Sequence, residues 1–367
     1  MIDKRIDKVF FWIVVSLVLL GFFAFTSASL GLLAKEGIKF SDVALNQVFF
    51  GIFLGSLALL YFSRVKYTFW QKYGFYIFIA SVLATLLVFI PGIGIEHGGA
   101  KRWIDLGFVS FQPAEFLKLG LVVYLAALLS SFKPKIKSFS YGFVPLAAVL
   151  GVSGLILLSQ PDTGTLLVIV ITAMTMFIAA GGRWKHVLGF GALGGIAATI
   201  LVFLRPYIMD RVVTFLDPSK DPLGLSYQIQ QSLIAIGSGG IIGKGFGQSL
   251  QKFDYLPEAI GDSIFAIWAE EFGFIGAASL IVLFLFFAIR GLRIARISTT
   301  HFGRLLAIGL VILIVSQSFI NIASMLGVFP ITGMPLLFVS HGGTALFFTL
   351  LEVGIILNIS KYRRERR

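Results

Sequence analysis

Long apolar runs alternate with short polar connections along almost the whole chain of 367 residues. A helix that crosses a lipid bilayer needs about 20 consecutive, mostly apolar residues. The segments that approach or exceed this length are 9–33, 43–62, 73–90, 113–131, 141–158, 163–180, 187–204, 263–289, 305–328 and 335–359. The pattern therefore predicts an all-α polytopic membrane protein with about ten transmembrane helices, in a single membrane domain that covers residues 1–367.

One long polar stretch interrupts this pattern between the seventh and eighth apolar segments, at residues 205–262. Long connections are usually either functional or disordered. Apolar residues recur through this one, among them Leu233, Ile242 and Leu256, and they favour a folded segment. We expect a large extracytoplasmic loop that forms a cap, with Asp262 at the point where the cap meets the membrane.

Composition supports the membrane assignment and excludes several kinds of site. Hydrophobic residues make up 57% of the chain and charged residues only 13%, whereas soluble domains average about 25% charged residues. The absence of cysteine excludes disulfides, a thiolate nucleophile and cysteine-ligated zinc or iron–sulfur centres. The four histidines lie too far apart in sequence to give a metal-ligand spacing.

Lysine and arginine concentrate in alternate connections, which indicates the orientation in the membrane. The N-terminus, four alternate connections and the C-terminal tail hold 20 of the 30 basic residues but only 3 of the 18 acidic residues. We therefore expect a multi-pass protein of the plasma (inner) membrane with both termini cytoplasmic and the cap outside. Topology and contact with anionic lipids explain the net charge of +12 better than nucleic-acid binding does.

The first candidate site on the outer side precedes and begins the fourth apolar segment. Pro113 suits the first turn of a helix, so Glu115 and Lys118 share a helix face and can pair. Charges at this depth either line a polar cavity or form a structural ion pair near the interface. Trp103, beside Lys101 and Arg102, suits an interfacial belt or the frame of a phosphate site.

Two further outer segments carry candidate residues. Asp162, in SQPDTGT, is either a site residue or the N-cap of the next helix. In GVFPITGMPLLFVSHGGTA, proline and glycine interrupt the membrane helices, which is tolerated where the backbone lines a cavity or is buried in protein. Gly342 and Gly343 suit such a site or a small-residue packing contact.

The chain resembles the SEDS family of membrane proteins, which includes FtsW, RodA and SpoVE. The similarity covers nearly the whole chain and rests on ordered motifs. They are TSAS, AKRWIDLG followed by QPAEFLKL, SQPDTGT, the stretch from RVVTFLDPSKDPLGLSYQ to GQSLQKFDYLPE, DSIFAIWAEEFGFIG, NIASMLGVFPITGMPLLFVSHGGTA and LNIS. The wording GQSLQKFDYLPE is more similar to the division branch than to the elongation branch.

The resemblance implies a glycosyltransferase that polymerises lipid II into glycan strands at the outer face of the membrane during cell division or elongation. It implies a class B penicillin-binding protein as transpeptidase partner, together with divisome or elongasome proteins, and no nucleic acid. The essential acid of the family falls on Asp262. The implied substrate-binding residues are Glu115, Lys118, Arg211, Arg102, Gln112, Glu258, Asp162, Ser340, Gly342 and Gly343.

Three motifs depart from the family pattern. Ile260-Gly261 replaces His-Thr before the acid, and Leu45-Asn46-Gln47 replaces Lys-Arg-Gln near the second span. The motif SYGGS reads SHGGT, with His341 at its second position. These departures leave the acid intact and put substrate details and neutralisation of the pyrophosphate in question.

The implied reaction needs a general base for the acceptor hydroxyl and cations for the leaving pyrophosphate. Burial beside Ile264 and Phe265 would raise the pKa of Asp262, and Glu258, four residues earlier, would disfavour its ionisation further if this segment is helical. The structural alternative for Asp262 is an N-cap of the helix that follows. A lipid II flippase or transporter and a non-catalytic divisome scaffold are the alternative functions. The residues predict no cofactor, and a divalent cation (Mg or Mn) is left open.

Overall fold

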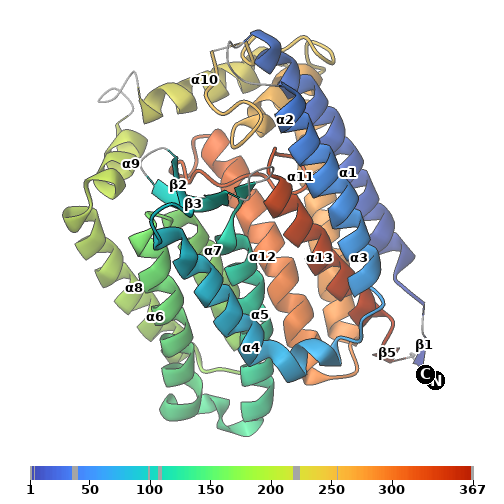
Figure 1. Cartoon of the computed structure of the whole chain (residues 1–367), viewed down its shortest axis with the longest axis vertical. Coiled ribbons are helices and arrows are strands. Elements are labelled where there is room, and N and C mark those ends of the chain that lie inside the picture. The colour runs from blue at the N-terminus through green and yellow to red at the C-terminus, as the bar shows by residue number, and fades with distance from the viewer. Residues whose placement is uncertain are drawn as a thin grey trace.

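Long helices packed side by side form the body of the protein (Figure 1). The computed structural model describes residues 2–3, 5–34, 40–97, 100–105, 110–217, 224–253 and 255–364. Its helices are α1 (Lys8–Ser29), α2 (Phe40–Leu45), α3 (Gly55–Phe62), α4 (Thr68–Leu86), α5 (Pro113–Phe132), α6 (Val144–Ser159), α7 (Thr163–Ala179), α8 (Trp184–Leu204), α9 (Pro206–Leu216), α10 (Leu225–Ser238), α11 (Ile264–Ile297), α12 (His301–Met325) and α13 (Gly343–Ser360). Pro218, Lys220, Asp221 and Asp254 of the predicted cap lie outside the described residues.

Short elements complete the described chain. The π-helix η2 (Asn46–Leu54) joins α2 to α3, and 3-10 or π turns lie at η1 (Leu30–Ala34), η3 (Leu87–Phe89), η4 (Lys133–Lys137) and η5 (Phe139–Phe143). The strands are β1 (Ile2–Asp3), β2 (Gly94–His97), β3 (Ala100–Asp105), β4 (Ser110–Phe111) and β5 (Arg363–Arg364).

The polytopic membrane fold is confirmed. In the described part of the chain, nine helical segments are long and apolar enough to cross a membrane. The shorter apolar helix α7, with 17 residues, corresponds to the sixth predicted span. The total of ten spans therefore stays a prediction.

One detail of the sequence prediction is wrong, namely where the last helix begins. The last helix begins at Gly343 instead of residue 335, and α12 ends at Met325, so residues 326–342 are not helical. Gly327 and Gly333 adopt positive φ angles there, and Pro330 and Pro335 lack the amide that a continuing helix needs. The structure adds one feature that the sequence did not predict: β2, β3 and β4 form a small antiparallel sheet between α4 and α5.

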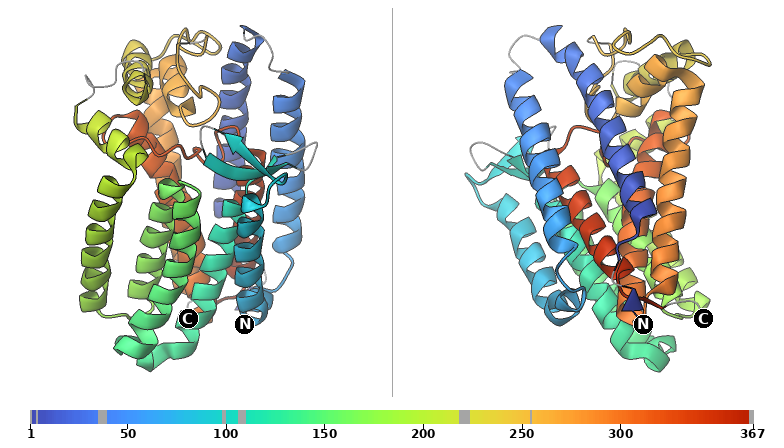
Figure 2. Two further views of the ribbon diagram at one scale, coloured as in Figure 1. Left: turned by 60° about the vertical axis from the view of Figure 1, so that its left-hand side comes forward. Right: turned by 90° about the vertical axis from the view of Figure 1, so that its right-hand side faces the viewer.

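The two ends of the bundle differ in what they carry. Both termini lie at one end, where β1 pairs with β5 (Figure 1). The sheet β2–β4 and the helices α9 and α10 lie toward the other end (Figure 2). Helix α12 contacts α5, α7, α11 and α13 and is largely buried, whereas α8 has no buried residue. The predicted cap therefore contains α9 and α10, and α12 forms the centre of the bundle.

Helix α11 is broken at Gly273, where the backbone has φ 63° and ψ −162°. Backbone hydrogen bonds on both sides of the break join α11 to the segment after α10. Lys244 N donates to Glu270 O before the break, and Phe274 N donates to Gly240 O after it. The break thus docks the glycine-rich segment after α10 onto α11. A residue with a Cβ rarely adopts this backbone conformation, which is essentially restricted to glycine.

We expect Gly273→Ala to destabilise the protein by about 1–3 kcal/mol through backbone strain alone. The added Cβ would also lie 2.4 Å from the Gly243 amide nitrogen, so the docked segment would have to shift. Thermal melting of the purified variant measures the effect. Gly195→Ala on α8 is the matched control, because a Cβ there meets no atom within 4 Å. Equal melting temperatures for the two variants would contradict the prediction.

Candidate active site around Asp262

Asp262 lies in the turn that leads into α11, and its backbone is fixed by other elements. The side chain of Asn321, on α12, donates to the Asp262 carbonyl oxygen at 2.8 Å. The Ser340 hydroxyl donates to Gly261 O at 2.6 Å, and the His341 amide donates to Ile260 O at 2.7 Å. Three consecutive carbonyl groups are thus held by residues distant in sequence, and this fixes where the Asp262 carboxyl group lies.

The surroundings of the Asp262 carboxyl group shift its pKa toward neutral pH. Burial is the largest cause, followed by the nearby Glu258 carboxylate, and together they raise the pKa of Asp262 to about 7 although Arg211 and Arg102 lower it. The sequence predicted the effect of burial. It predicted the effect of Glu258 only for a helical segment, whereas residues 258–262 form turns. The residue keeps partial exposure to solvent. An acid with a pKa near the working pH suits general-base catalysis.

The structure rejects the N-cap alternative for Asp262 and supports it for Asp162. Ser263 is the N-cap of α11, and no side chain there caps the helix. In contrast, the Asp162 carboxylate accepts from the Thr165 amide at 3.1 Å at the start of α7. Asp162 therefore has a structural role, while the Asp262 side chain is left for another one.

Two arginines approach Asp262 from different elements. Arg211, on the amphipathic helix α9, donates to Thr332 O at 3.3 Å. A Cβ placed on Gly333 would lie 3.7 Å from Asp262 Oδ2 and 3.8 Å from Arg211 Nη2, so the carboxylate and the guanidinium group flank this glycine. Arg102, on β3, donates to the carbonyl groups of Gln160 and Pro161. The site thus combines a carboxylate with two guanidinium groups.

Glu115 and Lys118 form the predicted ion pair on α5, with 2.8 Å between Nζ and Oε1. Both residues are buried, and Lys118 Nζ also donates to Gln317 Oε1 on α12 at 2.6 Å. Gln112 lies just before this helix, where its carbonyl group accepts from the Glu115 amide. The buried Glu352, on α13, lies within the electrostatic influence of this pair. The pair is linked to the Asp262 region through α12, because Lys118 bonds Gln317 and Asn321 of the same helix bonds Asp262 O.

Ser340, Gly342 and Gly343 shape the start of α13 next to the Asp262 turn. The Gly342 amide donates to Gln47 Oε1 at 3.0 Å. A Cβ on Gly343 would lie 2.3 Å from Asn46 Oδ1, which shows that Gly343 serves close packing. The three motifs that depart from the family pattern therefore meet. The altered Asn46 lies against Gly343, and its unaltered neighbour Gln47 donates to Ser340 O. The main chains of residues 260–261 accept from residues 340–341.

His341 is neutral at physiological pH. Burial lowers its pKa to about 4, in spite of a hydrogen bond to the Val43 carbonyl group. Its ring stacks on Phe25 of α1, with 5.8 Å between the ring centroids. In the part of the chain that the structure describes, no group of three His, Asp or Glu side chains is placed to hold a metal ion. The divalent cation therefore stays open.

Comparison with known proteins gives a family. Residues 8–365 match the cell cycle protein family model for FtsW, RodA and SpoVE. The chain belongs to this family. Stage V sporulation protein E of Bacillus subtilis is 40% identical over 85% of each chain. A probable peptidoglycan glycosyltransferase FtsW of Geobacter sulfurreducens is 39% identical over 97% of this chain and 95% of the relative.

Solved structures of family members share the fold. A chain in a structure that reports structural coordination of polymerization and crosslinking by a peptidoglycan synthase complex has a TM-score of 0.79 and 28% identity, covering 98% of this chain and 99% of that one. Rod shape determining protein RodA of Thermus thermophilus has a TM-score of 0.71 and 25% identity, covering 98% of both chains.

Sequence analysis missed the polar face of α12 that organises the site of this family member. Gln317 donates to Pro335 O, Asn321 to Met334 O, and Ser324 to Pro330 O. The signal was present in the sequence, because three polar residues recur at i, i+4 and i+7 in an otherwise apolar span. In a helix this spacing puts them on one face.

We expect Glu115→Ala to lower stability by about 3–5 kcal/mol, because it leaves the buried Lys118 ammonium without its carboxylate. Lipid II polymerisation should fall as well, since Lys118 also holds Gln317. Melting temperature and polymerisation rate are the measurements. The double variant Glu115→Gln with Lys118→Met is the control: it removes both charges and should recover stability. If Glu115→Ala and Lys118→Ala both keep the melting temperature and the polymerisation rate of the wild type, the ion pair contributes to neither stability nor activity.

Proposed function

We propose that this protein polymerises lipid II into peptidoglycan glycan strands, with Asp262 as the general base. Family membership and relatives named probable peptidoglycan glycosyltransferase FtsW support the reaction class. The observation that carries the proposal is the Asp262 carboxyl group, which has a pKa of about 7, flanks Gly333 together with the Arg211 guanidinium group, and is under the electrostatic influence of Arg211 and Arg102. Substrate binding by the other predicted residues is part of the proposal, except for Asp162, which caps α7, and Gly343, which serves close packing.

The reaction follows from this arrangement. Asp262 takes the proton of the acceptor sugar hydroxyl, whose oxygen attacks the anomeric carbon of the donor. The bond from that carbon to undecaprenyl pyrophosphate breaks, and the pyrophosphate leaves with the bond electrons. The guanidinium groups of Arg211 and Arg102 stabilise the developing negative charge, as cations do in phosphoryl and pyrophosphoryl departure. Lys118, on α5, supports the site through its hydrogen bond to Gln317 on α12.

The partner and branch are inferred from the same relatives. The structural neighbour in a complex that couples polymerization with crosslinking supports a class B transpeptidase as partner. Identities of about 40% to a stage V sporulation protein and to FtsW proteins, against 25% to a RodA, support the division or sporulation branch. A flippase or a scaffold would bind lipid II or partners without forming polymer, so a purified polymerisation assay separates the three.

Asp262→Asn should reduce lipid II polymerisation by about 10²–10⁴-fold, because the amide cannot accept the proton. The variant should still fold, since Asn321 holds the backbone carbonyl group of residue 262 and not its side chain. Polymer yield with the partner transpeptidase present, together with the melting temperature, gives the answer. Asp210→Asn, on the exposed face of α9, is the matched control. A folded and active Asp262→Asn variant would remove Asp262 from catalysis.

The polymerisation rate of the wild type should fall as pH drops below about 7, because the base form of Asp262 is then lost. A carboxyl group with the ordinary pKa of 3.8 would keep the rate flat in this range. The measurement is kcat/KM between about pH 5.5 and about pH 8.5. A profile without an acid limb near neutrality would contradict the assigned base.

The proposed orientation places both termini in the cytoplasm and Asp262 outside the plasma membrane. Single cysteines at the exposed positions Glu96 and Ser138 test it without background, because the chain has no native cysteine. We expect an impermeant maleimide applied to intact cells from outside to label Glu96→Cys and not Ser138→Cys. The reverse pattern would invert the topology.

A further inference from the structure

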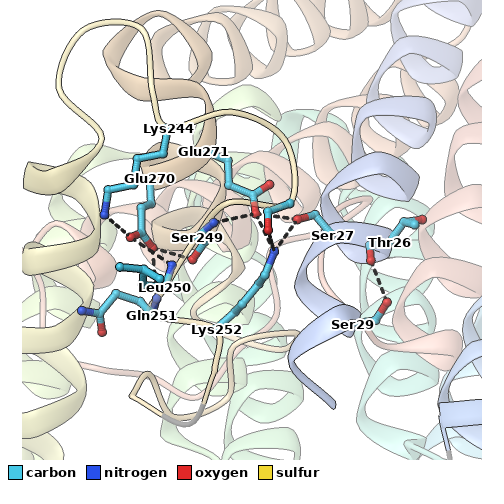
Figure 3. Close-up of polar contacts among 11 residues, drawn as sticks. Thr26, Ser27, Ser29, Lys244, Ser249, Leu250, Gln251, Lys252, Glu270 and Glu271 are labelled. Carbon is cyan, nitrogen blue, oxygen red and sulfur yellow. Dashed lines mark hydrogen bonds and ion pairs between the residues drawn. The ribbon is translucent and has the colours of Figure 1, made fainter. Parts of the chain in front are cut away.

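A second group of buried charges lies on α11 beyond the Asp262 turn, and the proposed mechanism does not use it (Figure 3). Glu270 and Glu271 are 0% and 2% exposed, and Lys252 is 2% exposed. Removing three charges from water is costly unless each is paired and hydrogen-bonded. The arrangement of their partners therefore shows what the cluster stabilises.

Glu271 joins three distant parts of the chain. Its Oε1 atom accepts from Lys252 Nζ at 2.9 Å and from the Ser27 hydroxyl of α1 at 2.5 Å. The Ser249 amide also points to this oxygen, at 3.4 Å. The carboxylate thus connects α11, the outer part of α1 and the segment before Asp262.

Lys252 uses its whole donor capacity in this cluster. An ammonium group has three donors, and Lys252 Nζ donates to Glu271 Oε1, to Ser27 Oγ at 3.1 Å and to Gly247 O at 2.8 Å. No donor is left for a ligand, and the ion pair is inaccessible to solvent. Lys252 is therefore an anchor rather than a proton donor or a substrate ligand.

Glu270 holds the same segment from its other side. It pairs with Lys244 Nζ at 2.6 Å, and it accepts from the Ser249 hydroxyl and from the amides of Leu250 and Gln251. Figure 3 shows the carboxylates of Glu270 and Glu271 bonded to this segment, which lies between α11 and α1. Residues 244–252 are thus fixed through side chains as well as through the backbone bonds at the Gly273 break.

Fixing residue 252 constrains the short connection to Asp262, whose far end is already held at residues 260–262. Between these two ends lies a cavity of about 130 Å³, lined by Ala28, Gly31, Leu32, Lys252, Glu258, Ala259 and Ile260. One wall of this cavity is the segment that carries Glu258, whose charge acts on Asp262. Movement of residue 252 would therefore change both the position and the hydration of the site.

We infer that the buried Lys252–Glu271 ion pair, bridged to α1 by Ser27, is a positioning device that holds residues 255–262 in their reactive geometry. The inference rests on the proposed function of Asp262. It assigns no substrate contact to Lys252 or Glu271. Misplacing a reacting group by about 1 Å can cost on the order of 10²-fold in rate.

The test replaces both partners together, as Lys252→Met with Glu271→Gln, so that no unpaired charge remains buried. We expect a folded protein whose kcat for lipid II polymerisation falls about 10–10²-fold while KM changes little. Water entering the loosened site should lower the pKa of Asp262, so the acid limb of the rate profile should move to lower pH. Glu258, Arg211 and Arg102, the charged groups around Asp262, are unchanged in this variant.

A second readout does not depend on activity. In an Ala259→Cys background, the maleimide reaction rate at residue 259 should rise several-fold in the double variant, because this residue lines the cavity. Ser27→Ala removes only the bridging hydroxyl, so it should shift the labelling rate and the acid limb in the same direction by a smaller amount. This variant replaces the double variant if the double variant does not fold. Asp7→Asn with Arg290→Leu is the matched control, since it removes a 2.9 Å ion pair at the opposite end of the bundle.

The outcomes separate the inference from the proposed function. Loss of polymerisation in Asp262→Asn tests the function alone. Faster labelling and a shifted acid limb, seen in the Lys252/Glu271 or Ser27 variants and not in the Asp7/Arg290 control, support the positioning role. A melting temperature that falls while labelling and the acid limb stay at wild-type values would reduce the cluster to a structural one and overturn the inference.

Discussion

The non-helical segment between α12 and α13 imposes the constraint on which the rest of the site depends. Residues 326–342 run through the protein with most of residues 331–340 buried, so their carbonyl groups need partners other than water. The polar face of α12 supplies these partners, and the Asn321 amide bonds both Met334 O and Asp262 O. The same hydrogen bonds therefore pair the buried backbone carbonyl groups and position the proposed base.

The electrostatics of Asp262 follow from opposing effects of this placement. Burial and Glu258 favour the neutral acid, while Arg211 and Arg102 favour the carboxylate. The balance leaves the group near its ionisation point at neutral pH, where it can both take and release a proton. The same guanidinium groups are suited to a pyrophosphate, so pKa control and charge stabilisation use shared residues.

The departures from the family pattern gain meaning from their contacts. Asn46, Ile260 and His341 come from three separate motifs, yet they meet near the Asp262 turn. Asn46 lies against Gly343, and the His341 amide donates to Ile260 O. The neutral, buried His341 ring packs against Phe25, so the altered residues are integrated in a packed layer behind the acid.

The sequence by itself determined the membrane class, most span positions, the Glu115–Lys118 pair and the burial that raises the pKa of Asp262. These features depend on hydrophobic runs and on spacing within single helices, which are local. Only the tertiary structure decided the start of α13, the α12 ladder, the N-cap question at Asp262, and the link from Lys252 through Glu271 to Ser27. Their partners lie up to 244 positions apart, and no local pattern specifies which buried polar groups will meet once the helices pack.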